Sequence, residues 1–107
     1  MEKDLSTALL LDLYGALLPE RQLKCLKCYY EEDLSLSEIS ENEGITRQGV
    51  RDNIKRGEAF LIQCEQKLGL AGRLREMEKH LDAACILIDE GKPGNAKQEL
   101  LTVKNLL

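Results

Sequence analysis

Residues 34–56 decide the fold of this chain and read LSLSEISENEGITRQGVRDNIKR. Ser35 and Glu38 fit a capping box, in which each side chain binds the backbone N–H of the other residue at the start of a helix. Gly44 stands where helices commonly end in a left-handed residue, and the Thr46 hydroxyl can cap the next helix. The pattern therefore predicts a short helix, a glycine turn and a second helix.

The first of these helices is predicted over 36–43 and the second over 46–68. The second has an apolar stripe, mostly at three- and four-residue steps, made by Val50, Ile54, Leu61, Cys64 and Leu68. At about 100° per residue, Gln48, Arg51 and Lys55 fall on the side away from this stripe. Two capped helices across a tight turn are typical of a helix-turn-helix motif, whose second helix enters the major groove of DNA. The alternative is that the cations form a solvated surface without a ligand.

The composition suits an aliphatic helix bundle. Of 107 residues, 43% are apolar and only 4% are aromatic, and no lasting two-residue alternation predicts a sheet. The net charge is −4, but the stretch 46–56 alone carries four basic residues and one acid, which leaves −7 on the rest of the chain. Because phosphate neutralisation drives DNA affinity, we expect intrinsic DNA binding to be weak and salt-sensitive, or to need a dimer or partner.

Four cysteines occur, and Cys25 and Cys28 form a lone C-x-x-C. A zinc site usually has four ligands, but Cys64, Cys85 and the single His80 do not lie at ligand spacing. We therefore predict buried, reduced core cysteines, no metal site and no cofactor. His80 is interpreted as a surface residue.

Three further features bear on location and catalysis. Reduced cysteines without a signal peptide predict the cytoplasm. The run Leu9-Leu10-Leu11 is too short to cross a bilayer, so no membrane insertion is expected. The chain has no glycine-rich phosphate loop and one isolated histidine, so we assign no catalytic residues and predict no enzyme.

Apolar periodicity predicts further helices over 4–18, 20–31, 73–90 and 95–106. Leu9, Leu13 and Leu17 are expected on the inner side of the first of these helices. Asn95 is expected to cap the last one, after the Gly-Lys-Pro-Gly break that precedes it.

Flexible glycines near position 69 divide the predicted fold into a helix-turn-helix domain over 1–68 and a helical extension over 69–107. The extension has more apolar surface than the core of the first domain requires. Its heptad-like positions are Leu74, Met77, Leu81 and Ile88. Exposed residues of this kind favour association. We expect them to pack back on the chain or to form a partner interface, and we predict a homodimer through them.

The segment 34–56 closely resembles the signature of the YlxM family of small bacterial helix-turn-helix proteins, and the resemblance covers roughly residues 5–90. The first four helices are also similar to the promoter-reading C-terminal domain of sigma factors, through Leu18-Pro19, the segment 34–39 and Val50. The resemblance implies an all-α fold, with a helix-turn-helix of the winged-helix-like superclass that lacks a wing, and a long helical C-terminal extension. It also implies a link to the signal recognition particle pathway, whose genes commonly neighbour those of the family.

By position, the recognition helix of the family corresponds here to Arg47, Gln48, Arg51, Asn53, Lys55 and Arg56. Arginine and glutamine suit guanine and adenine edges, and the later cations of the set suit phosphates. The chain departs from the general helix-turn-helix pattern at Ser40, where alanine is preferred. The Ser40 hydroxyl therefore needs a backbone acceptor.

Two functions stay open. One is a DNA-binding regulator that takes part in the signal recognition particle pathway. The other is an adaptor that binds the particle's GTPase, its receptor or its RNA without reading a DNA sequence. The intact motif favours the regulator, whereas the acidic balance favours the adaptor, since DNA-binding domains of this size are usually basic. RNA is the weaker partner candidate, because aromatic side chains for base stacking are nearly absent.

Overall fold

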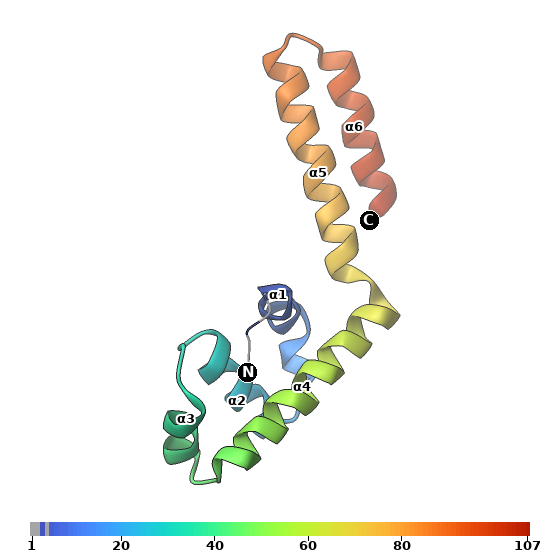
Figure 1. The fold of residues 1–107 in the computed structure, drawn as a ribbon. Coiled ribbons are helices and arrows are strands. Elements are labelled where there is room, and N and C mark those ends of the chain that lie inside the picture. The colour runs from blue at the N-terminus through green and yellow to red at the C-terminus, as the bar shows by residue number, and fades with distance from the viewer. Residues whose placement is uncertain (1–2, 4) are drawn as a thin grey trace. The chain divides into compact units, whose positions relative to one another are not determined.

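The computed structural model describes residue 3 and residues 5–107. This part of the chain contains helices and no strand, so the predicted all-α fold is confirmed (Figure 1). The elements run in the order α1 (Leu5–Tyr14), the 3₁₀ turn η1 (Gly15–Leu17), α2 (Glu20–Tyr30), α3 (Leu36–Glu43), α4 (Arg47–Leu68), α5 (Leu70–Asp89) and α6 (Pro93–Leu106). They group into two units, Met1–Leu68 and Gly69–Leu107.

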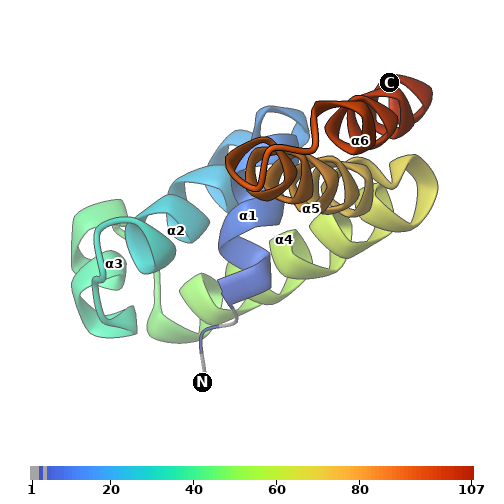
Figure 2. The same cartoon turned by 90° about the horizontal axis from the view of Figure 1, so that it is seen from above.

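In the first unit, α1, α2 and α3 pack along the long helix α4 (Figures 1 and 2). The largest fully buried aliphatic side chains of this unit are Leu26, Ile39, Val50, Ile54 and Leu61. Gly57 is buried on the same side of α4, and a Cβ there would lie 2.5 Å from Leu26 Cδ1. The interruption in the apolar stripe of α4 therefore marks a close approach to α2.

The predicted rotation of α4 about its axis is confirmed. Val50 and Ile54 are buried, whereas Gln48, Arg51 and Lys55 are exposed. The basic side chains therefore lie away from the core of the first unit, where a ligand can reach them.

Helix α4 ends at Leu68 as predicted, but the burial of Leu68 and the start of α6 differ from the prediction. Leu68, placed on the buried stripe, is 55% exposed at the end of α4, where Gly69 adopts a left-handed conformation with φ 62°. Helix α6 begins at Pro93, with Lys92 as its N-cap, so Asn95 lies inside the first turn and is not the cap. Proline at the first helical position is favoured because its φ is already helical and its missing N–H would be unsatisfied there anyway.

The inner side of α1 also differs from the prediction. Leu9 and Leu13 are only half-buried, and Leu17 is 60% exposed. The residues of this segment that are buried are Thr7, Leu10, Leu11, Tyr14, Gly15 and Leu18. A run of leucines offers several apolar sides, so periodicity does not select one. The Tyr14 hydroxyl donates a hydrogen bond to Glu65 Oε1 at 2.6 Å, which holds α1 in the observed rotation.

In the second unit, α5 and α6 form an antiparallel pair (Figures 1 and 2). Ala84 and Ala96 are each 2% exposed, and their small side chains let the helices approach closely. His80 Nδ1 lies 2.5 Å from Glu99 Oε2, and the His80 side chain is 25% exposed. The interpretation of His80 as a surface residue is therefore wrong, because it links the two helices. No helix of the described residues is long and apolar enough to cross a bilayer.

Candidate nucleic-acid interface

The start of α3 is held by the predicted capping box. Ser35 Oγ accepts a hydrogen bond from the Glu38 N–H at 3.1 Å, and Glu38 Oε1 accepts one from the Ser35 N–H at 3.1 Å. These hydrogen bonds lower the pKa of the Glu38 carboxyl below its ordinary value, so Glu38 is ionised at neutral pH. The prediction of this cap is confirmed.

The turn between α3 and α4 is held by three local features. Gly44 adopts the left-handed conformation with φ 68°. The Ser40 hydroxyl donates to the Ile45 carbonyl, which supplies the backbone acceptor that the sequence requires. Thr46 Oγ1 accepts from the Gly49 N–H at 2.9 Å and caps α4 as predicted. Together these contacts set the angle between the two helices of the motif.

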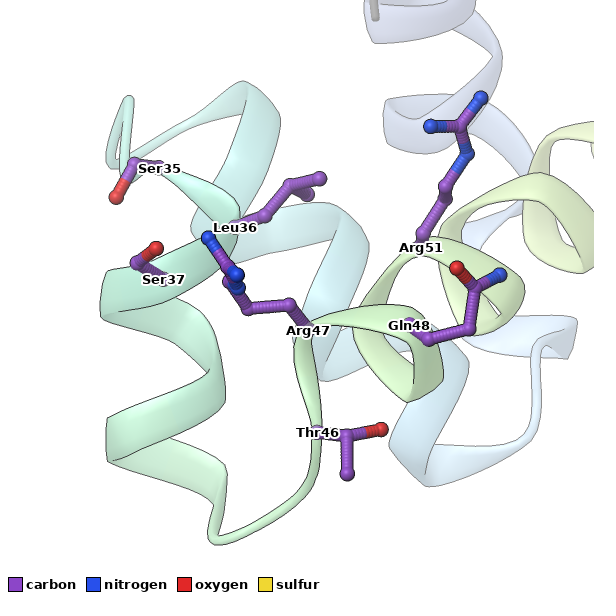
Figure 3. A pocket seen from close by; sticks show the side chains of 7 residues that line it. All are labelled: Ser35, Leu36, Ser37, Thr46, Arg47, Gln48 and Arg51. Atoms are coloured by element: carbon purple, nitrogen blue, oxygen red, sulfur yellow. The ribbon is translucent and has the colours of Figure 1, made fainter.

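An open groove lies between the starts of α3 and α4, and we call it the α3–α4 groove. Its volume is ≈ 530 Å³, and its lining residues are Ser35, Leu36, Ser37, Thr46, Arg47, Gln48 and Arg51. Arg47 reaches from the first turn of α4 toward α3, and Arg51 extends from the next turn (Figure 3). The groove is therefore bordered by two guanidinium groups, one amide and three hydroxyl groups.

The charges at the start of α4 are unfavourably placed for the helix itself. The first turn contains no acidic residue, and Arg47 occupies the first helical position. The positive end of the helix dipole disfavours cations there, typically by a few tenths of a kcal/mol up to about 1 kcal/mol each. Within the described part of the chain, neither Arg47 nor Arg51 has an ion-pair partner. An anionic ligand would relieve both effects.

The six residues carried over from the recognition helix are not all placed alike. Arg47, Gln48 and Arg51 share the α3–α4 groove. The remaining three lie elsewhere, namely Asn53, Lys55 and Arg56. Asn53 is half-buried and donates its side-chain amide to the Gly49 carbonyl at 2.8 Å.

The two later cations each have other neighbours. Lys55 Nζ lies 3.9 Å from Glu58 Oε1 within α4. Arg56 lines a separate depression together with Leu17 and Phe60. The structure therefore concentrates the candidate contacts at the first two turns of α4.

A family model described as "Putative helix-turn-helix protein, YlxM / p13 like" matches residues 1–91. The chain belongs to the UPF0122 family. The resemblance to YlxM proteins that the sequence suggests is therefore confirmed.

Similar proteins span most of the chain. A UPF0122 protein of Desulforamulus reducens is 43% identical over 99 residues, which cover 92% of this chain and 85% of that protein. A UPF0122 protein of Acetivibrio thermocellus is 41% identical over 102 residues, with 86% and 87% covered. A UPF0122 protein of Clostridium kluyveri is 36% identical over 107 residues, with 100% and 96% covered.

Three groove residues of this UPF0122 protein were not predicted from the sequence as contacts, namely Ser35, Leu36 and Ser37. The capping box located the start of α3, but a cap does not show which side of a helix meets its neighbour. Only the packing of α3 on α4 brings these residues beside Arg47.

The cysteines of the UPF0122 chain behave as core residues with one exception. Cys25, Cys28 and Cys64 are buried, whereas Cys85 is exposed. Burial raises the pKa of the Cys25 and Cys28 thiols above its ordinary value, and Glu43 near Cys25 and Glu32 near Cys28 raise it further. In the part of the chain that the structure describes, no group of three or more His, Cys, Asp or Glu side chains is arranged to hold a metal ion.

Proposed function

We propose that this UPF0122 protein is a non-enzymatic DNA-binding regulator that contacts DNA through the α3–α4 groove. The observation that carries the proposal is the pair of exposed arginines, Arg47 and Arg51, at a helix start without an acidic residue. In this role Arg47 and Arg51 bind guanine edges or phosphates, and Gln48 binds adenine. The hydroxyl groups of Ser35 and Ser37 are donors for the phosphate backbone.

A hydrogen bond within the groove and the negative charge around it both predict that DNA binding is weak. Gln48 Nε2 donates to Asp52 Oδ1 at 2.9 Å, and this hydrogen bond must be exchanged for one to a base. Ionised Glu38 lies at the start of α3, and the whole chain carries a net charge of −4. Both terms oppose the approach of phosphates and lower the affinity. The phosphate contacts of Arg47 and Arg51 make the affinity fall as salt rises. The proposed location is the cytoplasm, which the free cysteines support.

The test compares two variants with the same change of net charge. Arg47→Ala/Arg51→Ala/Lys55→Ala removes cations from α4, and the control Arg21→Ala/Lys24→Ala/Lys27→Ala removes three exposed cations from α2. Fluorescence anisotropy with mixed-sequence duplex DNA across a salt series measures binding. We expect the α4 variant to lose binding, with a salt slope about one unit smaller per lost phosphate contact, and the control to bind like the wild type. Equal losses in both variants would contradict a specific contact by α4.

A second function is supported by the acidic balance of the chain. We propose as the alternative that the same surface binds a component of the signal recognition particle, namely its GTPase, its receptor or its RNA. This use of the motif needs no DNA sequence reading, since a fold can serve protein contact as well. Calorimetric titration of each purified component with the two triple variants separates the cases. The adaptor function is correct if the α4 variant keeps DNA binding and loses one of these components.

A further inference from the structure

Both helices of the second unit leave large apolar side chains exposed. On α5 these are Leu74, Leu81, Ile86 and Ile88, with 39%, 42%, 59% and 57% of their surface exposed. On α6 Leu100 and Leu101 are 42% and 41% exposed, and Leu107, directly after the helix, is 82% exposed. The predicted interface on α5 therefore has a counterpart on α6.

Except for Ile86 and Leu101, the exposed apolar residues of α5 and α6 lie on one side of the pair. On α5, His80 and Ala84 mark the direction of α6, and Leu81 and Ile88 lie about a quarter turn further round at 100° per residue. On α6, Glu99 and Ala96 mark the direction of α5, and Leu100 lies about a quarter turn further round in the same sense. Because the helices are antiparallel, equal rotations bring both sets to the same side. We call this surface the hairpin face.

The two edges of the hairpin face carry opposite charges. Along the outer edge of α5 three exposed acids, Glu78, Asp82 and Asp89, outnumber one exposed cation, Arg75. Lys97 and Lys104 are exposed along the outer edge of α6. Within the described part of the chain, Glu78, Asp82, Lys97 and Lys104 have no ion-pair partner. The hairpin face is thus an apolar centre between an acidic edge and a basic edge.

We propose that the hairpin face binds the hairpin face of a second copy of this chain, forming an antiparallel four-helix bundle with a two-fold axis parallel to the helices. This axis lays α5 of each copy on α6 of the other, so each acidic edge meets a basic edge. A two-fold axis perpendicular to the helices would lay α5 on α5 and oppose like charges. Charge complementarity therefore selects both the occupant and the axis.

The His80–Glu99 contact fixes which residues of α5 and α6 lie at the same height along the hairpin. These heights decide which charged residues of the two copies would meet in the dimer. Residues 80 and 99 are level in the hairpin, so Asp82 is level with Lys97, two residues nearer the turn on each helix. A two-fold axis parallel to the helices keeps these heights, so Asp82 of one copy faces Lys97 of the other. Glu78 is level with residue 101, and Lys104 lies about 4.5 Å further along α6 at 1.5 Å per residue, within reach of its long side chain.

Dimerisation is independent of the proposed DNA binding, but it would assist that binding. A dimer carries two α3–α4 grooves, and therefore twice the number of arginines available for phosphate contacts. Because affinity rises with the number of phosphates neutralised, two weak grooves on one particle bind DNA more tightly than one.

Sedimentation equilibrium from low to high micromolar concentration tests the proposal on the full chain. We expect a dimeric wild type, a shift of Leu81→Glu toward monomer with a dimer Kd at least about 30-fold higher, and no shift for Ile86→Glu. Ile86 is the matched control, since it is 59% exposed but lies on the opposite side of α5 from the hairpin face. A monomeric wild type, or equal shifts in the two variants, would overturn the proposal.

Charge reversal tests the axis, with circular dichroism to check that each variant keeps its helices. Asp82→Lys and Lys97→Asp should each raise the dimer Kd by roughly 3- to 10-fold, and the double variant should recover most of the loss. Failure of the double variant to recover would show that these two residues do not meet and would overturn the proposed bundle. The dimer Kd is measured without DNA, so its dependence on these charges tests the bundle separately from the proposed function.

Discussion

The two units of the chain differ in how completely the apolar sides of their helices are buried. In the first unit three helices pack on α4, and Val50 and Ile54 are 0% exposed. In the second unit the apolar residues of α5 have α6 beside them, yet Leu81 and Ile88 remain 42% and 57% exposed. One neighbour covers only part of a wide apolar side, and a further helical layer is needed for the rest. The exposed leucines of the second unit therefore mark the side on which the proposed bundle would add a further layer.

The largest effect is expected from a charge on the covered side. Val50→Asp buries an unpaired carboxylate at a fully buried position, which should destabilise the first unit by about 3–5 kcal/mol. Ile86→Asp is the control, since Ile86 is 59% exposed and lies outside the hairpin face, so water reaches a carboxylate there. Thermal unfolding followed by circular dichroism should give a much lower midpoint for Val50→Asp alone. Equal stability of the two variants would contradict the difference between the units.

Replacing a glycine by alanine should also change the stability of the two units differently. In Gly57→Ala the new Cβ would lie 2.5 Å from Leu26 Cδ1 within a fully buried contact, so we expect a loss of about 1–3 kcal/mol despite the better helix propensity of alanine. Gly94→Ala in α6 meets nothing within 4 Å and should be neutral or slightly stabilising. Urea unfolding measures both changes. A stabilised Gly57→Ala would mean that α4 and α2 are further apart than the structure places them.

The two helix starts make a smaller test. Thr46 Oγ1 binds the Gly49 N–H, so Thr46→Ala should cost about 1 kcal/mol through the lost cap. Asn95 lies inside the first turn of α6, so Asn95→Ala should cost little or nothing. Chemical denaturation of both variants gives the comparison. A larger loss from Asn95→Ala would restore the predicted start of α6 at that residue.

The smallest expected effect is a difference in thiol reactivity between the two units, and its measurement leaves the fold intact. Cys25 and Cys28 are buried, and their raised pKa keeps the thiols protonated at neutral pH, so both should react slowly with iodoacetamide. Cys85 is exposed and should react first. Intact-mass spectrometry of the native protein should show one rapid addition, and Cys85→Ser should abolish it. Several rapid additions to the wild type would indicate that the first unit is less closed than proposed.

Local signals were enough to predict the motif at the centre of the chain. The capping box of Ser35 and Glu38, the left-handed Gly44 and the cap at Thr46 all depend on residues within a few positions of one another. The rotation of α4 followed from a single apolar stripe, which allowed only one buried side. The same approach failed for α1, because its leucine run offers more than one apolar side.

The sequence by itself determined the all-helical class, the helix-turn-helix segment and the family, because each rests on local hydrogen bonds or on contiguous residues. The tertiary structure alone decided which candidate contacts share a groove. It brought Arg47, Gln48 and Arg51 together beside α3, and it left Arg56 in a different depression. It also decided that His80 links α5 to α6 through Glu99. These placements depend on how the helices pack against one another. That packing is set by many side chains together, which lie far apart along the chain, so no local sequence pattern predicts it.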